Sequence, residues 1–435
     1  MSSPRPHFLV LTFPFQGHIA PALRLAQRLL ADVPDALVTF STTEAAHRHM
    51  FPAKPGDGDG AKVPADEHDS RLEFLPFSDG TEAGILPNMA LNAYLASFHA
   101  EGARTVAEIL DDLATRGRPV TRVVYTLLLP WAADVARDRG VPSALYWIQP
   151  VAVFAIYFHY FHGHGTVVAE HRHDPSFVVE LPGLAPLTIG DLPNFLTDAL
   201  GALAAVGAHD VLPVGPVLQS GEMSGIFKQD DVEYMEWLDA KPENSVVYVA
   251  FGSLATMGRE QLDELLLGLE ESGRPYLCVI RKDIKVALTD AEAEMPHECL
   301  KNGMVVEWCD QVRVLLHAAV GCFVTHCGWN SVMESVASGV PMVCVPGVSD
   351  QRMNAHLIVH DWRVGVRAQV DKGGVLRAAE VRRCIDEVMD DSEAAVEVRQ
   401  MAGKWKQIVV EATGKGGSSY RNLMAFMDDG ARSAV

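Results

Sequence analysis

Short apolar runs alternate with longer segments of helical periodicity along most of the chain. An unbroken apolar run of about 4–8 residues is typical of a buried parallel strand, whereas apolar residues three and four apart indicate an amphipathic helix. The predicted strands are His7–Phe13, Ala36–Ser41, Leu72–Phe77, Arg122–Leu129, Ser245–Phe251, Pro275–Arg281, Met304–Trp308 and Cys322–Thr325. The predicted helices include Ala22–Leu30, Asn92–Leu113, Glu260–Ser272, Arg377–Met389 and Ser392–Val410. This alternation predicts an α/β fold with parallel sheets.

The chain has 435 residues, which suggests two domains of about 200 residues each. A segment with Gly215-Pro216 and several polar residues, at 214–229, separates the two halves of the strand–helix pattern. We therefore expect a first domain at residues 1–213, a linker at 214–229 and a second domain at 230–417, followed by a terminal helix within 418–435.

The segment Ser143–Phe161 contains no carboxylate, Lys or Arg and is long enough to span a membrane. Gln149-Pro150 divides it into a strand-like and a helix-like half, and its aromatic residues suit a core or pocket wall better than lipid. The apolar run that begins at His7 leads directly into a helix pattern, so we interpret it as a strand and not a signal peptide.

Composition excludes several classes of partner. The chain is 48% hydrophobic and 21% charged, and its 56 acidic against 36 basic residues give a net charge of −20, which argues against nucleic acid and anionic membranes. Its seven cysteines lack framework spacing, as in reduced cytoplasmic proteins. The dinucleotide fingerprint G-x-G-x-x-G does not follow the first strand, which makes a nicotinamide-dependent enzyme an unfavoured alternative.

The stretch from Trp308 to Gln351 carries the strongest chemical signal. The apolar run Cys322–Thr325 predicts a strand, and a short loop from His326 leads into a helix. The free amides and the macrodipole at such a helix start favour a phosphate, which His326 would meet at the end of the strand. Ser331 and Glu334 also fit the capping box S-x-x-E, an alternative that assigns both of them a purely structural role.

This stretch resembles the secondary-product signature of plant UDP-dependent glycosyltransferases, and the chain is most similar to their crocetin and anthocyanin 5-O-glucosyltransferase-like group. The resemblance implies a GT-B fold, with two Rossmann-like domains facing across a cleft and the last helix returning to the first domain. It implies inverting transfer of glucose from UDP-glucose to a hydroxyl or carboxyl group of a small apolar metabolite, such as a flavonoid, an apocarotenoid or a hormone-like acid. It implies no metal cofactor, and we expect a monomer.

The resemblance also implies roles for the signature residues. Trp308 stacks on uracil and the Cys309 backbone bonds to it, while Gln311 and Glu334 hold the ribose. The residues on the diphosphate and sugar include His326, Gly328, Trp329, Asn330, Ser331, Asp350 and Gln351, with Gln351 the usual choice for glucose. We also expect Gly17 and Ser253 at the donor. Val348 departs from the bulky residue that relatives usually have there.

The first domain supplies the base in this family. His18 lies in the turn P-F-Q-G-H-I-A-P, and a histidine of pKa near ~6.5 accepts a proton from a hydroxyl held beside it. We expect Phe15, Trp147 and Phe154 to line the acceptor pocket. Relatives place an Asp beside this base where Thr126 stands here. We therefore predict that Thr126 orients the imidazole without balancing its charge, and that the acceptor is acidic, a phenol or a carboxylic acid.

Two further features leave alternatives open. The triplet Asp57-Gly58-Asp59 could bind a metal nucleotide, but its Gly-rich surroundings favour a loop. The segment 197–206 is shorter than in relatives. With Thr126, that shortness motivates the alternative of a UDP-sugar-binding protein with impaired transfer chemistry.

Overall fold

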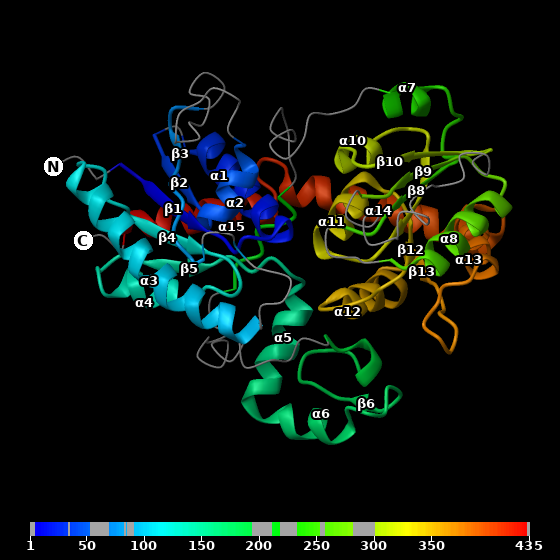
Figure 1. The fold of residues 1–435 in the computed structure, drawn as a ribbon, viewed down its shortest axis with the longest axis horizontal. Helices are drawn as coiled ribbons and strands as arrows, with labels where there is room; N and C mark the ends of the chain where they lie inside the picture. The colour runs from blue at the N-terminus through cyan, green and yellow to red at the C-terminus, as the bar shows by residue number, and fades with distance from the viewer. Residues whose placement is uncertain are drawn as a thin grey trace. The chain divides into compact units, whose positions relative to one another are not determined.

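The computed structural model describes residues 5–33, 35–52, 69–81, 84, 91–193, 211–217, 233–252, 257–281 and 301–432 (Figure 1). The chain divides into two compact units, the first formed by Met1–Ile148, Thr197–Lys228 and Lys415–Val435 and the second by Gln149–Leu196 and Gln229–Gly414. Each unit contains a parallel sheet with helices between successive strands, so the α/β prediction is confirmed.

The sheet of the first unit has the strand order β3-β2-β1-β4-β5. Its strands are β1 (His7–Leu11), β2 (Leu37–Ser41), β3 (Leu72–Phe74), β4 (Arg122–Tyr125) and β5 (Ser143–Leu145). Its helices are α1 (Gln16–Asp32), α2 (Glu44–Met50), α3 (Leu91–Thr115), α4 (Trp131–Arg137) and α15 (Ser418–Arg432). Every residue of β1 and β2 is buried, which explains why these strands read as continuous apolar runs.

Helix α1 begins earlier than the sequence predicts. The residues around His18 were predicted to form a turn before a helix at Ala22–Leu30, yet the helix already starts at Gln16. The amides of His18 and Ile19 both donate to the carbonyl of Phe15, at 2.8 and 2.9 Å. Pro21 lacks one helical donor but its φ suits a helix, so the buried apolar face outweighs the missing bond. His18 therefore lies in a first helical turn.

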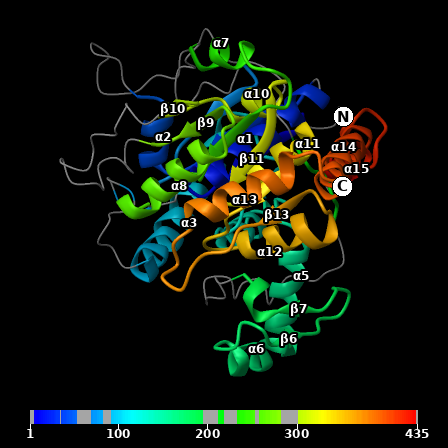
Figure 2. The same ribbon diagram turned by 90° about the vertical axis from the view of Figure 1, so that its right-hand side faces the viewer.

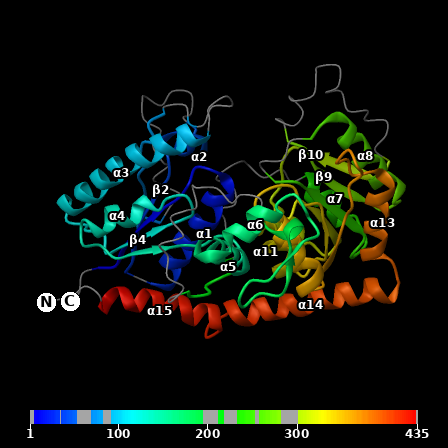
Figure 3. The ribbon, with the colours of Figure 1, turned by 90° about the horizontal axis from the view of Figure 1, so that it is seen from below.

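Helix α15 belongs to the core of the first unit although it ends the chain. Arg122 of β4 donates to the Phe426 carbonyl at 2.8 Å, and its guanidinium lies over the Phe426 ring, 4.5 Å from the ring centroid. Figure 3 shows α15, in red, alongside the helices and strands of the first unit. Leu423 is buried among residues of α1 and β2, and the Ser419 hydroxyl donates to the Gly215 carbonyl at 2.7 Å.

The sheet of the second unit has the order β10-β9-β8-β11-β12-β13. Its strands are β8 (Val246–Ala250), β9 (Tyr276–Val279), β10 (Gly303–Val306), β11 (Val320–Thr325), β12 (Met342–Cys344) and β13 (Gly365–Arg367). Its helices include α7 (Glu233–Asp239), α8 (Arg259–Glu271), α10 (Gln311–Leu315), α11 (Trp329–Ser338), α12 (Gln351–His356), α13 (Ala378–Met389) and α14 (Glu393–Thr413). Figure 2 shows α8 beside α13, where Gly268 permits close approach to Val381. The short strands β12 and β13 were not predicted.

Residues Gln149–Leu196 group with the second unit, whereas the predicted first domain extended to residue 213. This segment forms α5 (Val151–His159), a π-helical turn, α6 (Gly165–His171) and an antiparallel pair, β6 (Val178–Val179) and β7 (Leu187–Thr188). Asp191 links this segment to β13 and α12 of the second unit, because its carboxylate binds Arg367 at 3.1 Å and His356 at 3.3 Å. Burial alone would raise the pKa of Asp191, but the bonds from His356 and Thr188 and the charge of Arg367 lower it.

The uncharged segment Ser143–Phe161 divides as predicted, into strand β5 and helix α5 on either side of Gln149-Pro150. Among the described residues, no helix has both the length and the apolar character needed to cross a membrane.

Candidate active site

The turn between β11 and α11 is the centre of the site. All six residues of β11 are buried, and the strand lies between β8 and β12 in the sheet. Cys327 then adopts a left-handed conformation with φ of 64°, and Gly328 is the N-cap of α11 without a side-chain capping bond. The helix starts at Trp329, so Ser331 and Glu334 lie inside it and do not form a capping box. The backbone amides at the start of α11 are therefore not capped by a side chain from this helix, as a phosphate site requires.

The ring of His326 packs closely against two glycines, Gly252 and Gly328, which have no side chain to displace it. A Cβ atom on Gly328 would lie 2.3 Å from His326 Nε2, and one on Gly252 would lie 2.6 Å from the same nitrogen. Gly252 also has a positive φ of 71°. Burial lowers the pKa of His326 to about 4, against a smaller opposing effect of the Ala250 backbone. The ring is neutral at pH 7, so it meets an anion as a hydrogen-bond donor and not as a cation.

Gln311 joins two elements of the site through its side chain. Its Nε2 donates to Ser331 Oγ at 2.9 Å and to Glu334 Oε2 at 2.7 Å, and its Oε1 accepts from the Tyr248 hydroxyl at 3.2 Å. Tyr248 is buried on β8, lies 3.4 Å from Cys309 Sγ and stacks on Phe323 with ring centroids 4.8 Å apart. The structure therefore brings together Cys309, Gln311, Ser331 and Glu334, which the sequence predicted, and adds Tyr248, which it did not.

Trp308 and Cys309 occupy the segment between β10 and α10. Trp308 is half-buried and Cys309 is buried. The following residue, Asp310, caps α10 by accepting from the amides of Val312 and Arg313, each at 3.1 Å. This cap fixes the chain direction at Trp308 and Cys309.

Asp350 and Gln351 lie at the start of α12. Asp350 is 7% exposed, and burial raises the pKa of its carboxyl, opposed chiefly by the bond from Asn354. Gln351 Oε1 accepts from the amides of Gly347 and Val348, at 2.8 and 3.1 Å. The side-chain oxygen of Gln351 thus stabilises the preceding loop, and these two bonds do not use its Nε2 donors. Val348, the departure from the family pattern, is 55% exposed.

In the first unit, His18 and Thr126 do not form the predicted pair. The Thr126 hydroxyl donates to Thr12 Oγ1 at 3.3 Å and accepts from the Phe13 amide at 3.4 Å, so it is committed to the strand ends and does not orient the imidazole. His18 Nδ1 is buried and has no hydrogen-bond partner among the described residues. Burial lowers the pKa of His18 to about 4, so its ring is neutral at pH 7.

The remaining predicted residues are distributed as follows. Gly17 is the second residue of α1, and Phe15 precedes that helix with its ring 5.0 Å from Phe13. Trp147 follows β5 in the first unit, whereas Phe154 lies on α5 in the second. Ser253, the Asp57-Gly58-Asp59 triplet and the segment 197–206 lie outside the described residues, as does most of the predicted linker.

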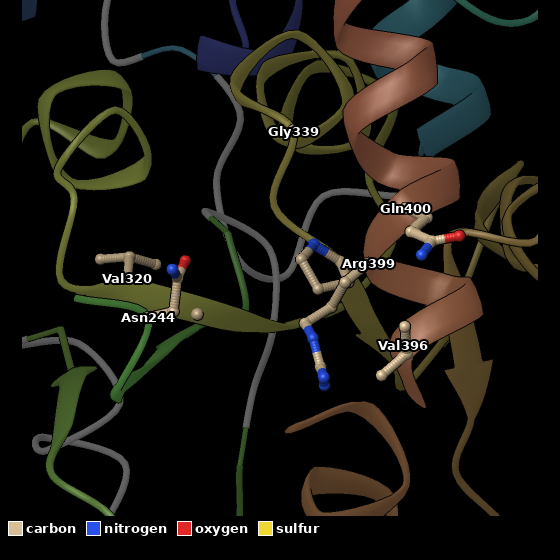
Figure 4. A pocket seen from close by; sticks show the side chains of 8 residues that line it. Asn244, Val320, Gly339, Val396, Arg399 and Gln400 are labelled. Atoms are coloured by element: carbon tan, nitrogen blue, oxygen red, sulfur yellow. The ribbon is translucent and has the colours of Figure 1, made fainter. Parts of the chain in front are cut away.

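Two other features bear on ligands. Figure 4 shows a cavity of about 370 Å³ lined by residues that include Asn244, Val320 and Arg399. Asn244 and Val320 lie where β8 and β11 begin, whereas His326 follows the other end of β11. Arg399 lines it but donates to the carbonyls of Val388 and Asp390, both at 2.8 Å, so its charge serves the end of α13. In the part of the chain that the structure describes, no cluster of three or more His, Cys, Asp or Glu residues is arranged to hold a metal ion.

Comparison with known proteins decides the family. Residues 216–402 match the family described as UDP-glucoronosyl and UDP-glucosyl transferase. The chain is 38% identical to crocetin glucosyltransferase, chloroplastic, of Gardenia jasminoides, with 98% of each chain covered. It is also 38% identical to anthocyanidin 3-O-glucoside 5-O-glucosyltransferase 1 of Perilla frutescens, covering 99% of this chain and all of that one. The chain belongs to the UDP-glycosyltransferases.

A solved structure supports the same assignment for this UDP-glycosyltransferase. The rice protein Os79, crystallised in complex with UDP, matches 97% of this chain and all of its own with a TM-score of 0.80 and 31% identity. The predicted GT-B fold and the resemblance to the crocetin and anthocyanin 5-O-glucosyltransferase-like group are therefore confirmed.

Proposed function

We propose that this enzyme transfers glucose from UDP-glucose, with inversion at C1, to a hydroxyl or carboxyl group of a small apolar plant metabolite. The observation that carries the proposal is the turn from β11 to α11, where a neutral His326 stands beside a helix start whose N-cap residue, Gly328, makes no side-chain capping bond. The names of the relatives, a crocetin glucosyltransferase and an anthocyanidin 3-O-glucoside 5-O-glucosyltransferase, support an apolar acceptor of this kind.

The donor occupies the second unit in this proposal. Trp308 stacks on uracil, and the backbone of Cys309 bonds to the same ring. Gln311 and Glu334 hold the ribose, which is supported by their mutual bond of 2.7 Å. His326, Gly328, Asn330 and Ser331 surround the diphosphate, with Ser253 as a further contact. Trp329, Asp350 and Gln351 bind the glucose hydroxyls.

The chemistry requires one base and one leaving group. His18 accepts the acceptor proton while the acceptor oxygen forms a bond to C1 of glucose, and the bond from C1 to the diphosphate oxygen breaks with its electron pair. Negative charge then grows on the β-phosphate, where a neutral His326 and the α11 amides donate without rearranging. Because both histidines have lowered pKa values, both are in the protonation state that these roles need at pH 7.

The acceptor is expected to be acidic. The Thr126 hydroxyl is bonded to Thr12, and among the described residues no group bonds to Nδ1 of His18. No carboxylate partner therefore stabilises a protonated His18 there, so this base is weak. A phenol or a carboxylic acid needs less help than an aliphatic alcohol. Phe15, Gly17, Trp147 and Phe154 remain proposed contacts of the ligands.

The function is tested by incubating the purified protein with UDP-glucose and a panel of flavonoids, hydroxycinnamates, apocarotenoid acids and hormone acids, with UDP release and glucoside formation measured together. We expect both products in equal amount, unchanged by EDTA, and a preference for UDP-glucose over UDP-galactose. If UDP-galactose outcompetes UDP-glucose in direct competition, the assignment of Gln351 to glucose is wrong.

The alternative is a UDP-sugar-binding protein with impaired transfer, motivated by the missing partner of His18. Binding of UDP-glucose by calorimetry, without UDP release on any member of the panel, would favour it. A cytoplasmic monomer completes the proposal, and light scattering on the purified protein measures its oligomeric state.

A further inference from the structure

Asn354 connects two parts of the donor site through one amide group. It lies on α12 and is completely buried. Its Nδ2 donates to the carbonyl of Cys327 at 2.8 Å and to Asp350 Oδ2 at 2.7 Å. A backbone carbonyl and a carboxylate oxygen are both acceptors, so only the NH₂ end of the amide satisfies them, and its two hydrogens match its two partners.

A helix gains nothing from an asparagine at this position. Asn is a poor helix former, and burying its amide costs free energy unless both ends are bonded. Asn354 Oδ1 is nevertheless buried without a hydrogen-bond partner among the described residues. The NH₂ bonds therefore offset the cost of an unsatisfied oxygen.

The bond to Cys327 acts on a strained residue. Cys327 has a φ of 64°, a left-handed conformation that costs a non-glycine residue of order 1 kcal/mol or more and persists only where its surroundings hold it. Two local bonds to Thr325 hold one side, with the Cys327 amide on Thr325 Oγ1 at 3.2 Å. On the C-terminal side of Cys327, the Asn354 side chain donates to the Cys327 carbonyl. This conformation turns the chain from the end of β11 into Gly328, the N-cap of α11.

The bond to Asp350 acts on a buried carboxylate. Asp350 is the N-cap residue of α12, and its carbonyl also accepts from the Asn354 amide at 2.9 Å. The Asn354 side chain therefore restrains the Asp350 side chain from one turn further along the helix. Its bond lowers the pKa of this carboxyl more than the bonds from Ser349 and Gln149 do. We infer that Asn354 is a positioning residue that couples the diphosphate turn at Cys327 to the sugar-binding carboxylate of Asp350. This inference rests on the proposed function, which places the diphosphate at the turn that contains Cys327 and the glucose hydroxyls at Asp350.

The first test compares the variant Asn354→Leu, which is close in size but has no donor, with Asn302→Leu as a matched control. Asn302 is half-buried in the second unit, less than Asn354, and donates its Nδ2 to Glu270 at 3.2 Å, outside the donor site. We expect Asn354→Leu to weaken binding of UDP and to lower kcat/KM for UDP-glucose by about 10- to 100-fold, the usual effect of removing a group that orients a ligand-binding residue. The control should retain the wild-type values.

Rescue separates positioning from a general packing role. Glycine adopts a positive φ without strain, so Cys327→Gly in the Asn354→Leu background should restore most of the lost UDP affinity. In a double-mutant cycle with Asp350→Asn, the combined loss in kcat/KM should be smaller than the product of the two single losses. The reason is that each substitution alone already disrupts the bond between Asn354 and the Asp350 carboxylate. A combined loss in kcat/KM equal to the product of the two single losses, with no rescue of UDP affinity by Cys327→Gly, would overturn the inference. If the leucine variant does not fold, Asn354→Ser, which has one donor hydrogen instead of two, carries the same measurements.

The two proposals fail separately. If the wild-type protein binds neither UDP nor UDP-glucose, the proposed function is wrong. If the wild type binds and transfers glucose but Asn354→Leu behaves like Asn302→Leu, only the positioning role of Asn354 is wrong.

Discussion

Replacing His18 with alanine lowers kcat/KM for a phenolic acceptor by about 10²- to 10⁴-fold, the range typical of a lost general base, while the affinity for UDP stays unchanged. The reason is that His18→Ala removes the proposed proton acceptor, whereas Trp308, Glu334 and His326, the proposed contacts of uracil, ribose and diphosphate, lie in the second unit. Steady-state kinetics together with calorimetric titration of UDP measures both quantities.

The size of this loss should depend on the acceptor. A carboxylic acid is already ionised at pH 7 and needs no base, so His18→Ala should barely affect it, and the loss should grow with the pKa of the accepting group. If a simple aliphatic alcohol is the best substrate of the wild type and loses all turnover in His18→Ala, the acidic-acceptor proposal is wrong. The variant His47→Ala is the control, because burial also lowers the pKa of His47 but this residue lies on α2, outside the proposed site.

The pH dependence has a definite sign. The ring of His18 accepts a proton only when neutral, and burial lowers its pKa from the usual value near ~6.5 to about 4. With a phenol of high pKa, kcat/KM of the wild type should therefore stay level as the pH falls through 6.5 and decline only near pH 4. A decline centred near pH 6.5 would show that the free enzyme does not hold His18 in the buried environment seen here.

The donor half of the site was largely predictable from the sequence because it is nearly continuous in the chain. Trp308 to Gln351 contains a strand end, a helix start and the next helix start, and parallel strands bring their carboxyl ends to one edge of the sheet. Gln311 and Glu334 were predicted together and are bonded in the structure. Asn354 was missed because, three residues beyond Gln351, it looks like any polar helix position until its two acceptors are seen.

The parts that failed depend on long-range contacts. Tyr248 lies on β8, far from Gln311 in sequence, and an apolar run gives no sign that one of its side chains bonds into the site. Thr126 was aligned correctly to a strand end, but the neighbouring Thr12 takes its hydroxyl. The predicted domain boundary stays a prediction, but the ion pair of Asp191 with Arg367 of β13, which links Gln149–Leu196 to the second unit, is a contact that spacing does not show. Spacing along the chain carries no information on which of several nearby partners a polar group chooses.

Replacing Gly328 with alanine should disable the site through a single methyl group. Gly328 has a φ of −62°, which alanine adopts without strain, so the backbone tolerates the change. The new Cβ atom, however, would lie 2.3 Å from His326 Nε2 and 3.0 Å from its Cε1, and the ring must move away from the start of α11. Because removing one preorganised donor typically costs 10²- to 10³-fold in kcat, we expect about a 10²-fold loss in kcat for UDP-glucose with little change in the melting temperature.

Introducing Gly328→Ala into the variant His326→Ala shows whether displacement of the His326 ring causes the loss in kcat. Without the imidazole there is nothing for the new methyl group to displace, so Gly328→Ala should add almost no further loss to His326→Ala. The matched control is Gly403→Ala on α14, where a Cβ atom meets no other atom within 4 Å. That control should leave kcat unchanged and stabilise the protein by about 0.5–1 kcal/mol, since alanine replaces glycine inside a helix. A full 10²-fold loss from Gly328→Ala in the absence of the ring would show instead that the Gly328 backbone itself contacts the diphosphate in a way alanine cannot reproduce.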